Sequence, residues 1–441
     1  MASGIDHLGN GAAALYDSGP GPLPSRAVFL HTGWRTAGTW IWSRYRTLHG
    51  VMAFYEPLHE VLAKGPAVVM NVRPDVWSSG HPELKAPYFR EFIPLMDGRG
   101  VLGRHDTAFE MDRFDLAQDA NDPDLKAYLD SLVGAAEKRG KTAVLKFCRS
   151  MGRLRWMIRA FPDAAHIVVV RNPAAQWASM WSQMSRRGNP WFVAAPYRVL
   201  GANLDSSRVR RVMDALGCDT PDFHALASMK PEETGEPVRV APLDLSYRVF
   251  LAHWVLSTLS ISKEVSAIVD SDLMGLSPRY GELCGEQIRR ATGLAPDFSS
   301  AHPSRFSTES RPTEMWMGLD ARSVIGCHLA VDDFVQTEIG ANPAEGLALS
   351  VIRSKLAMAN QQAMLGGLAF QNSSAEAADR LRYCVDPLSF QSLIQEKHAA
   401  PLAGSGIRER VAALARRAGS RLLHRWLRPH PAAQPVEQTV R

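Results

Sequence analysis

Two short stretches of the sequence combine cations with hydroxyl groups in a way that suits the binding of an anion. The first, residues 35–40, follows the apolar run 27–31 and leads into the helix-forming residues 39–49. This order predicts a strand, a loop and a helix. The first N–H groups of a helix have no partner within it, and the helix dipole adds partial positive charge, so an anion is the natural ligand. The predicted binding residues are Arg35, Thr36, Ala37, Gly38, Thr39 and Trp40.

The spacing of glycines in this loop is that of a loop that binds nucleoside triphosphates, but its cationic residue is at a different position. Gly33 and Gly38 are five residues apart, as in the Walker A pattern G-x-x-x-x-G-K-[ST]. Thr39 and Trp40 stand where that pattern has Lys and then Ser or Thr. The cation lies inside the loop instead, at Arg35. We therefore predict a phosphorylated ligand other than a triphosphate; the alternative is a tight turn with a solvated arginine.

The second stretch begins at Arg171, directly after the β-branched run 166–170. Pro173 occupies the preferred first position of a helix, and Ser179 follows about two turns later, eight residues after Arg171. An arginine offers a planar fork to phosphate oxygens, and a serine offers a short hydroxyl donor. This spacing predicts a phosphate clamp; the alternatives are a surface cation at a strand end and a serine that faces solvent.

Regular alternation of strands and helices positions both stretches. A strand at 27–31, a helix at 39–49 and a strand at 51–55 form a βαβ unit, which predicts a parallel sheet. The pattern returns in a strand at 142–147, a helix at 151–161 and a strand at 166–170. Ligands of such sheets bind beyond the carboxyl ends of the strands. The predicted fold is a P-loop NTPase-like three-layer α/β/α domain with a mostly parallel sheet.

Two residues that follow the strand at 51–55 are candidates for proton transfer. Glu56 comes directly after this strand and is expected beside the anion loop. It is the first candidate for a general base, although Glu56 with Pro57 also suits the start of a helix. His59 is the second candidate, because its unperturbed pKa suits proton transfer near neutrality.

The rest of the chain divides by composition. We predict an acceptor-binding lid in residues 61–140, which do not follow the βαβ rhythm. A basic amphipathic helix is expected at 404–428, either on an anionic membrane surface or docked on the protein itself. The predicted parts are a flexible leader at 1–25, the α/β domain at 26–320, a helical extension at 321–400, the basic helix and a disordered tail at 429–441.

Composition limits the class of protein. A net charge of +5 on 441 residues suits a polyanionic ligand without requiring nucleic acid. No apolar run is long enough to span a bilayer, and the first residues lack a signal-peptide pattern. The five cysteines form no C-x-x-C pair, so neither a disulfide framework nor a structural zinc site is indicated. A cytoplasmic protein is expected, with possible contact to the inner face of the membrane through 407–428.

Both anion-binding stretches resemble a known family. The stretch 35–40 resembles the phosphosulfate loop of sulfotransferases that use 3′-phosphoadenosine 5′-phosphosulfate (PAPS), except that Ala37 and Gly38 depart from the commonest residues. Arg171 and Ser179 resemble the pair that holds the 3′-phosphate in that family. The string Tyr-Glu-Pro-Leu at 55–58 is similar to one in carbohydrate sulfotransferases.

The resemblance implies transfer of a sulfuryl group from PAPS to a hydroxyl, expected on a carbohydrate or glycolipid, with adenosine 3′,5′-bisphosphate as product. Arg35 would stabilise the leaving phosphate, and Glu56 or His59 would take the proton. No essential metal is expected, because the loop has no Walker lysine or serine. The alternatives are a small-molecule or nucleoside kinase and a catalytically silent nucleotide-binding protein.

Overall fold

The structure is a computed structural model that describes residues 25–72, 81, 84, 86–230, 233–301, 319, 321–340 and 346–372. It contains a five-stranded sheet in the order β2-β3-β1-β4-β5, in which every pairing is parallel. The strands are β1 (Ala27–Thr32), β2 (Val51–Tyr55), β3 (Thr142–Phe147), β4 (Ala164–Val170) and β5 (Ala267–Asp270).

The order of the strands creates a crevice beside β1. The chain leaves β1 toward β2 on one side, and it leaves β4 toward β5 on the other, although β1 and β4 are neighbours. Loops that diverge in this way leave an opening at the carboxyl ends of the two strands, which is where open α/β sheets bind ligands. Residues 33–37 and 171–172 are these two loops, so the fold brings together the two stretches predicted to bind an anion.

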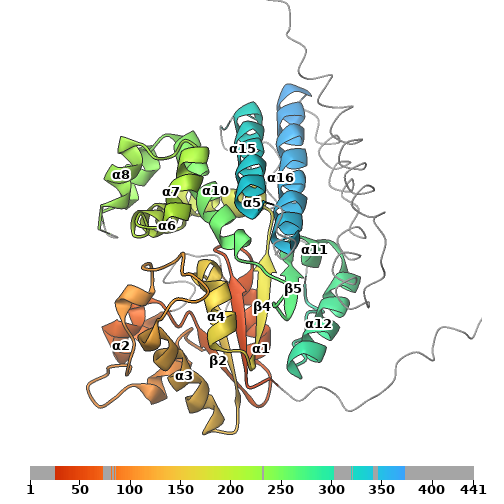
Figure 1. The fold of residues 1–441 in the computed structure, drawn as a ribbon. Helices are drawn as coiled ribbons and strands as arrows, with labels where there is room; N and C mark the ends of the chain where they lie inside the picture. The colour runs from red at the N-terminus through yellow and green to blue at the C-terminus, as the bar shows by residue number, and fades with distance from the viewer. Residues whose placement is uncertain are drawn as a thin grey trace, which may run out of the picture. The chain divides into compact units, whose positions relative to one another are not determined.

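Helices cover both faces of the sheet. On one side lie α3 (Pro123–Glu137) and α4 (Leu154–Ala160); on the other lie α1 (Gly38–Arg46) and α12 (Pro278–Thr292) (Figure 1). The connection from β1 to β2 crosses the sheet in the opposite direction to those from β2 to β3 and from β3 to β4. Because such connections are right-handed, α1 lies on one face of the sheet and α3 and α4 lie on the other. The predicted three-layer α/β fold with a parallel sheet is confirmed.

The segment between β2 and β3 is only partly an insertion. Residues 123–137 of it form α3, which is the crossover helix that the parallel pairing of β2 with β3 requires. Asp122 caps this helix by accepting from the Leu125 N–H at 3.2 Å, and Pro123 occupies its first position. The preceding part holds short elements: η1 (Glu60–Lys64), α2 (Pro66–Asn71), η2 (Arg90–Leu95) and η3 (Thr107–Phe109).

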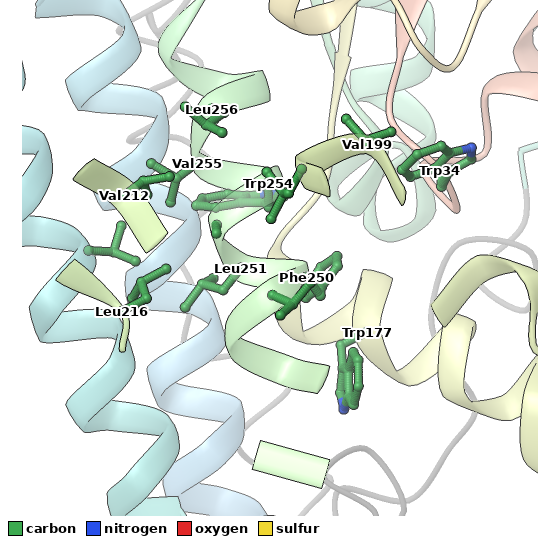
Figure 2. Packing of buried hydrophobic residues seen from close by; sticks show 14 of the residues in the cluster. Trp34, Trp177, Val199, Val212, Leu216, Phe250, Leu251, Trp254, Val255 and Leu256 are labelled. Atoms are coloured by element: carbon green, nitrogen blue, oxygen red, sulfur yellow. The ribbon is translucent and has the colours of Figure 1, made fainter. Parts of the chain in front are cut away.

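A helical layer follows β4 and contributes most of a large apolar core. Helix α10 (Leu243–Leu259) runs through it, and fourteen of its residues are buried. Figure 2 shows Phe250, Trp254 and their neighbours on α10 packed with Trp177 and with Trp34 of the loop after β1. The other helices of this part are α5 (Pro173–Arg187), α6 (Trp191–Gly201), α7 (Ser207–Ala215), α8 (Pro221–Ala227), α9 (Gly235–Val240) and α11 (Ser271–Leu276). The short η4 (Met151–Arg153), which lies between β3 and α4, also packs on α10.

Two long helices end the described part of the chain. They are α15 (Ala321–Ile339) and α16 (Gly346–Asn372), which pack on each other and on α10 (Figure 1). Helical structure was predicted for this region. The predicted leader 1–25 (apart from residue 25), the basic helix 404–428 and the tail 429–441 lie outside the described residues. Among the helices that are described, none has the length and apolar character needed to cross a membrane.

Candidate anion-binding site

The loop after β1 adopts a conformation that only a few residue types accept readily. Arg35 and Ala37 have φ values of 61° and 65°, in the left-handed region. Ala37 is the residue before α1, and no side chain caps this helix. The Thr36 hydroxyl stabilises the turn by donating to the Gly33 carbonyl at 2.8 Å. Left-handed backbone at two positions of one loop is a strain that proteins keep mainly where it shapes a functional site.

Close packing requires a glycine at position 38, the first residue of α1. A Cβ at Gly38 would lie 2.6 Å from the Thr32 side chain, which real structures do not tolerate. The Thr32 hydroxyl is itself fixed, because it donates to the Phe147 carbonyl of β3 at 2.7 Å. Gly38 therefore lets the start of α1 approach the end of β1, which brings the helix N-terminus to the loop.

The structure brings Arg35, Arg171 and Ser179 together. Nε of Arg35 donates to the Ser179 hydroxyl at 2.9 Å, and Nη1 of Arg171 donates to the Arg35 carbonyl at 2.6 Å. The guanidinium of Arg35 also lies over the Phe192 ring, 4.9 Å from its centre. Two predicted motifs that are more than one hundred residues apart in sequence thus form one site.

Positive charge is concentrated at this site. Burial, followed by the charges of Arg171 and Arg187, lowers the pKa of Arg35 to about 10. Burial also lowers the pKa of Arg171, although Asp272 opposes that shift. The charged form of Arg35 is thus destabilised by the neighbouring guanidinium groups, and a bound anion would relieve this repulsion. The site is therefore electrostatically suited to a phosphate or sulfate group.

Thr39 and Trp40 of the predicted loop lie within α1 and make contacts inside the protein. The hydroxyls of Thr39 and Tyr55 are 3.1 Å apart and share a hydrogen bond. Trp40 packs against Phe298, with the two ring centres 5.7 Å apart. Position 39 is where a Walker loop carries its lysine, so the structure has a neutral hydroxyl at the place of the triphosphate cation.

Glu56 lies at the end of β2 in a buried ion pair. Its carboxylate pairs with the Lys146 ammonium, accepts from the Cys148 N–H at 2.8 Å and lies 3.7 Å from Arg149. Burial alone would raise the pKa of Glu56, but Lys146 and Arg149 bring it below its ordinary value. A carboxylate held in this way is a weak base. The role of Glu56 as general base stays a prediction, and these contacts do not favour it.

His59 begins η1, where it accepts a hydrogen bond from the Val61 N–H at 3.2 Å through Nδ1. Burial and then the charge of Arg149 lower its pKa to about 3. The imidazole is therefore neutral at physiological pH, with Nδ1 engaged by the backbone. Its role as the second candidate base also stays a prediction.

Two carboxyl groups, those of Glu60 and Glu110, lie beside His59. Burial raises the pKa of Glu60, but its hydrogen bond with Glu110 and the charges of His59 and Arg149 together bring it to about 2. Burial raises the pKa of Glu110 to about 8, helped by Glu60 and opposed by Arg149. Ligand atoms of the three residues lie within 4.8 Å of one another, a spacing open to a metal ion. However, Nη2 of Arg149 lies 2.8 Å from Glu110 and already supplies positive charge. The positive charge of Arg149 thus compensates this cluster in part.

The structure adds a histidine that sequence reasoning missed. His81 is near enough to Arg35 and Lys146 for their charges to lower its pKa further, after burial has lowered it well below the usual value. Its Nδ1 is buried and has no hydrogen-bond partner among the described residues. The ring meets Tyr88 edge-on at 5.8 Å, and Tyr88 stacks on Tyr55. A neutral imidazole therefore lies beside the loop, within the segment predicted to be the acceptor lid.

A small cavity of about 30 Å³ lies behind the loop. It is bounded by the loop after β1, the end of β4, and helices α5, α10 and α16. Its polar lining includes Thr36, Arg171, Gln176, His253 and Lys355. A cavity of this size has room for about one water molecule. It shows that α16 reaches the back of the anion site.

Comparisons with known proteins give one similar solved structure. No protein-family model and no curated protein matches the chain. The chain is similar to the crystal structure of a sulfotransferase from Alicyclobacillus acidocaldarius, with 14% sequence identity and a TM-score of 0.32 over 75% of this chain and 99% of that one. Similarity at this level does not assign an activity, which has to be inferred from the site.

Proposed function

We propose that the chain is a sulfotransferase that moves a sulfuryl group from PAPS to a hydroxyl acceptor. The observation that carries the proposal is the meeting of Arg35, Arg171 and Ser179 at the crevice between β1 and β4. This arrangement provides two adjacent cationic groups, as a donor with a phosphosulfate at one end and a 3′-phosphate at the other requires. The neutral Thr39 at the Walker lysine position argues against a kinase.

The proposed reaction is an in-line displacement. The acceptor oxygen forms a bond to sulfur, the bond between sulfur and the bridging phosphate oxygen breaks, and that oxygen leaves with the electron pair. Negative charge therefore grows on the leaving phosphate. Arg35 and the N–H groups at the start of α1 would stabilise it as preorganised donors, in the way that such groups act in phosphoryl transfer.

The proton of the acceptor hydroxyl needs a base, and we assign this role to His81 rather than to Glu56 or His59. Burial, and then the charges of Arg35 and Lys146, keep the imidazole of His81 neutral, and its Nδ1 makes no hydrogen bond to a described residue. Binding of an anionic donor beside Arg35 would offset these charges and raise the affinity of His81 for a proton. Glu56 would instead hold Lys146 in place through their ion pair.

We expect the acceptor to be a hydroxyl of a carbohydrate or glycolipid, as the Tyr-Glu-Pro-Leu string at 55–58 suggests. In the described structure Tyr55 and Leu58 are buried, so this string shapes the site rather than exposing a surface. The acceptor would reach His81 from the side of the lid, whose main part is 61–122 once α3 is assigned to the fold.

The proposal is tested by incubating the protein with radiolabelled PAPS and a panel of sugars, glycolipids and phenols. We expect labelled sulfate ester on at least one acceptor, together with release of adenosine 3′,5′-bisphosphate. Absence of any binding of PAPS or of adenosine 3′,5′-bisphosphate, measured in parallel by thermal shift, would contradict the proposal. Binding of ATP in preference to both would favour a kinase.

A further inference from the structure

A buried lysine from the C-terminal helical region reaches the back of the anion site. Lys355 on α16 is fully buried, and its ammonium lies 2.6 Å from a carboxylate oxygen of Asp270 and 2.6 Å from one of Asp272. These two residues end β5 and begin α11, beside which α16 runs (Figure 1). Burial lowers the pKa of Lys355, but the two carboxylates together raise it above its ordinary value, so the lysine is charged at neutral pH.

Asp272 connects this lysine to the loop after β4. Its two carboxylate oxygens accept from the Asn172 N–H at 2.8 Å and from the Asn172 side-chain amide at 2.9 Å. Nε of Arg171 lies 3.9 Å from the same carboxylate, beyond hydrogen-bond distance, while Nη1 of Arg171 donates to the Arg35 carbonyl. Asp272 is thus held by Lys355 and Asn172 and only weakly engages Arg171.

The charge of Lys355 affects anion binding through the balance of charges around Asp272. Without Lys355, Asp270 and Asp272 would be two buried carboxylates with no ammonium between them. Arg171 is the other cation in contact with Asp272 among the described residues. An uncompensated buried carboxylate attracts such a neighbour strongly, because the low dielectric of the interior scarcely screens it. The guanidinium would then pair with Asp272 and be lost to a bound phosphate.

We propose that Lys355 is a positioning residue of the anion site: by neutralising Asp272, it keeps the guanidinium of Arg171 directed at a bound phosphate. The C-terminal helical extension is therefore part of the nucleotide site and more than a cover for the core. The inference rests on the proposed function, because it takes the 3′-phosphate of the donor as the anion that Arg171 binds.

The experiment compares the affinities of adenosine 3′,5′-bisphosphate and AMP, by calorimetry, in wild-type protein and four variants. The ratio of the two affinities reports on the 3′-phosphate, and a general loss of structure would lower both. Lys355→Met should reduce this ratio about tenfold or more. Lys355→Met/Asp272→Asn should restore it to the value of Asp272→Asn alone, because Lys355 acts through Asp272. Arg353 lies on the same helix as Lys355 and forms an exposed ion pair with Asp332 of α15, so Arg353→Met should leave the ratio unchanged.

The outcomes separate the two proposals. A wild-type protein that binds the two nucleotides equally would contradict the proposed function and the inference together. A wild-type preference that survives in Lys355→Met would contradict the inference alone. If Lys355→Met does not fold, Asp272→Asn is compared with Lys355→Met/Asp272→Asn. Equal ratios of bisphosphate to AMP affinity in these two variants would support the inference that Lys355 acts through Asp272, and unequal ratios would overturn it.

Discussion

Nε of Arg35 donates a hydrogen bond to the hydroxyl of Ser179 at 2.9 Å, across the crevice between the ends of β1 and β4. From sequence, Ser179 was predicted to act with Arg171 on one phosphate. In the structure Ser179 is a hydrogen-bond partner of Arg35, while Arg171 donates to the backbone carbonyl of Arg35. The two predicted phosphate contacts are therefore coupled through Arg35.

This coupling makes Arg35→Ala a specific test of the charge at the site. The variant should lose about 10²–10³ in kcat, because Arg35 is placed to stabilise the leaving phosphate. Its free form should melt at the same or a higher temperature, since removal of one crowded cation relieves the repulsion that lowers the pKa of Arg35. Turnover assays and thermal melts measure both effects. Arg44→Ala, on the adjoining helix α1, is the control and should retain full activity. A large drop in the melting temperature of Arg35→Ala would contradict this account.

His81 should be needed for the chemical step and not for binding of the donor. We expect His81→Gln to lose about 10²–10⁴ in rate while its affinity for adenosine 3′,5′-bisphosphate stays near that of the wild type. His49→Gln, at an exposed histidine, is the matched control. Because the pKa of His81 is lowered well below 6.5, the free enzyme should keep its base form, and thus kcat/KM, as pH falls from 8 toward 6. A loss of kcat/KM centred near 6.5 would show an unperturbed histidine or another base.

Glu56 offers a test that separates a structural role from a catalytic one. If its task is to neutralise Lys146, Glu56→Gln should lower the free energy of unfolding by about 3–5 kcal/mol, because a buried cation loses its partner. Glu56→Gln/Lys146→Met should recover most of that loss. A variant that keeps its stability but loses its rate would restore Glu56 as the base. Glu282→Gln, in an exposed pair with Arg279, is the control and should have little effect.

The same ion pair has a consequence for pH. The pKa of Glu56 in the folded protein lies below its ordinary value of 4.5. Its contribution to stability is therefore present above pH 4.5 and is lost as pH falls through the lower, folded-state pKa. Denaturant melts of the wild type and of Glu56→Gln/Lys146→Met should thus converge as the solution is acidified. A difference that does not depend on pH in that range would contradict the ion-pair role.

The close approach of α1 to β1 is tested by adding one methyl group. Gly38→Ala would place a Cβ 2.6 Å from Thr32, so the variant should be less stable and should bind adenosine 3′,5′-bisphosphate more weakly as the loop shifts. Gly134→Ala is the control, because its Cβ would meet no atom within 4 Å and alanine favours a helix by up to about 1 kcal/mol. Denaturant melts and calorimetry compare the two; equal stability of both variants would mean that α1 can move away from Thr32 at no cost.

Local sequence patterns were sufficient to predict the sheet. The strands at 51–55 and 142–147 have the predicted bounds, because nearly every residue in them is buried and both are short, mostly apolar segments as a strand covered on both faces requires. Residues 123–137 were predicted to belong to the lid, whereas they form α3. Asp122 and Pro123 are typical of a helix cap and first turn, and the leucines at 125, 129 and 132 follow at helical spacing. That signal was present in the sequence and could have been used.

Other parts of the site depend on contacts that no local pattern contains. Lys355 lies in an alanine-rich helix, and its partners Asp272 and Asp270 are 83 and 85 residues away. The pKa of His81 is lowered by burial and then by the charges of Arg35 and Lys146, and all three effects arise only in the folded chain. The partner of Ser179 could not be predicted either, because the spacing to Arg171 says nothing about which arginine the hydroxyl meets. Such tertiary contacts decide the chemistry of buried charged groups.

The central claim is that the crevice between β1 and β4 binds a nucleotide with a 3′-phosphate, and calorimetric titration of the wild-type protein tests it most directly. Adenosine 3′,5′-bisphosphate, AMP and ATP with Mg²⁺ would be titrated under identical conditions. We predict that the bisphosphate binds at least about tenfold more tightly than AMP, since charge-assisted hydrogen bonds contribute about 1.5–3 kcal/mol each. Equal affinities for the bisphosphate and AMP, or a preference for ATP, would contradict the account.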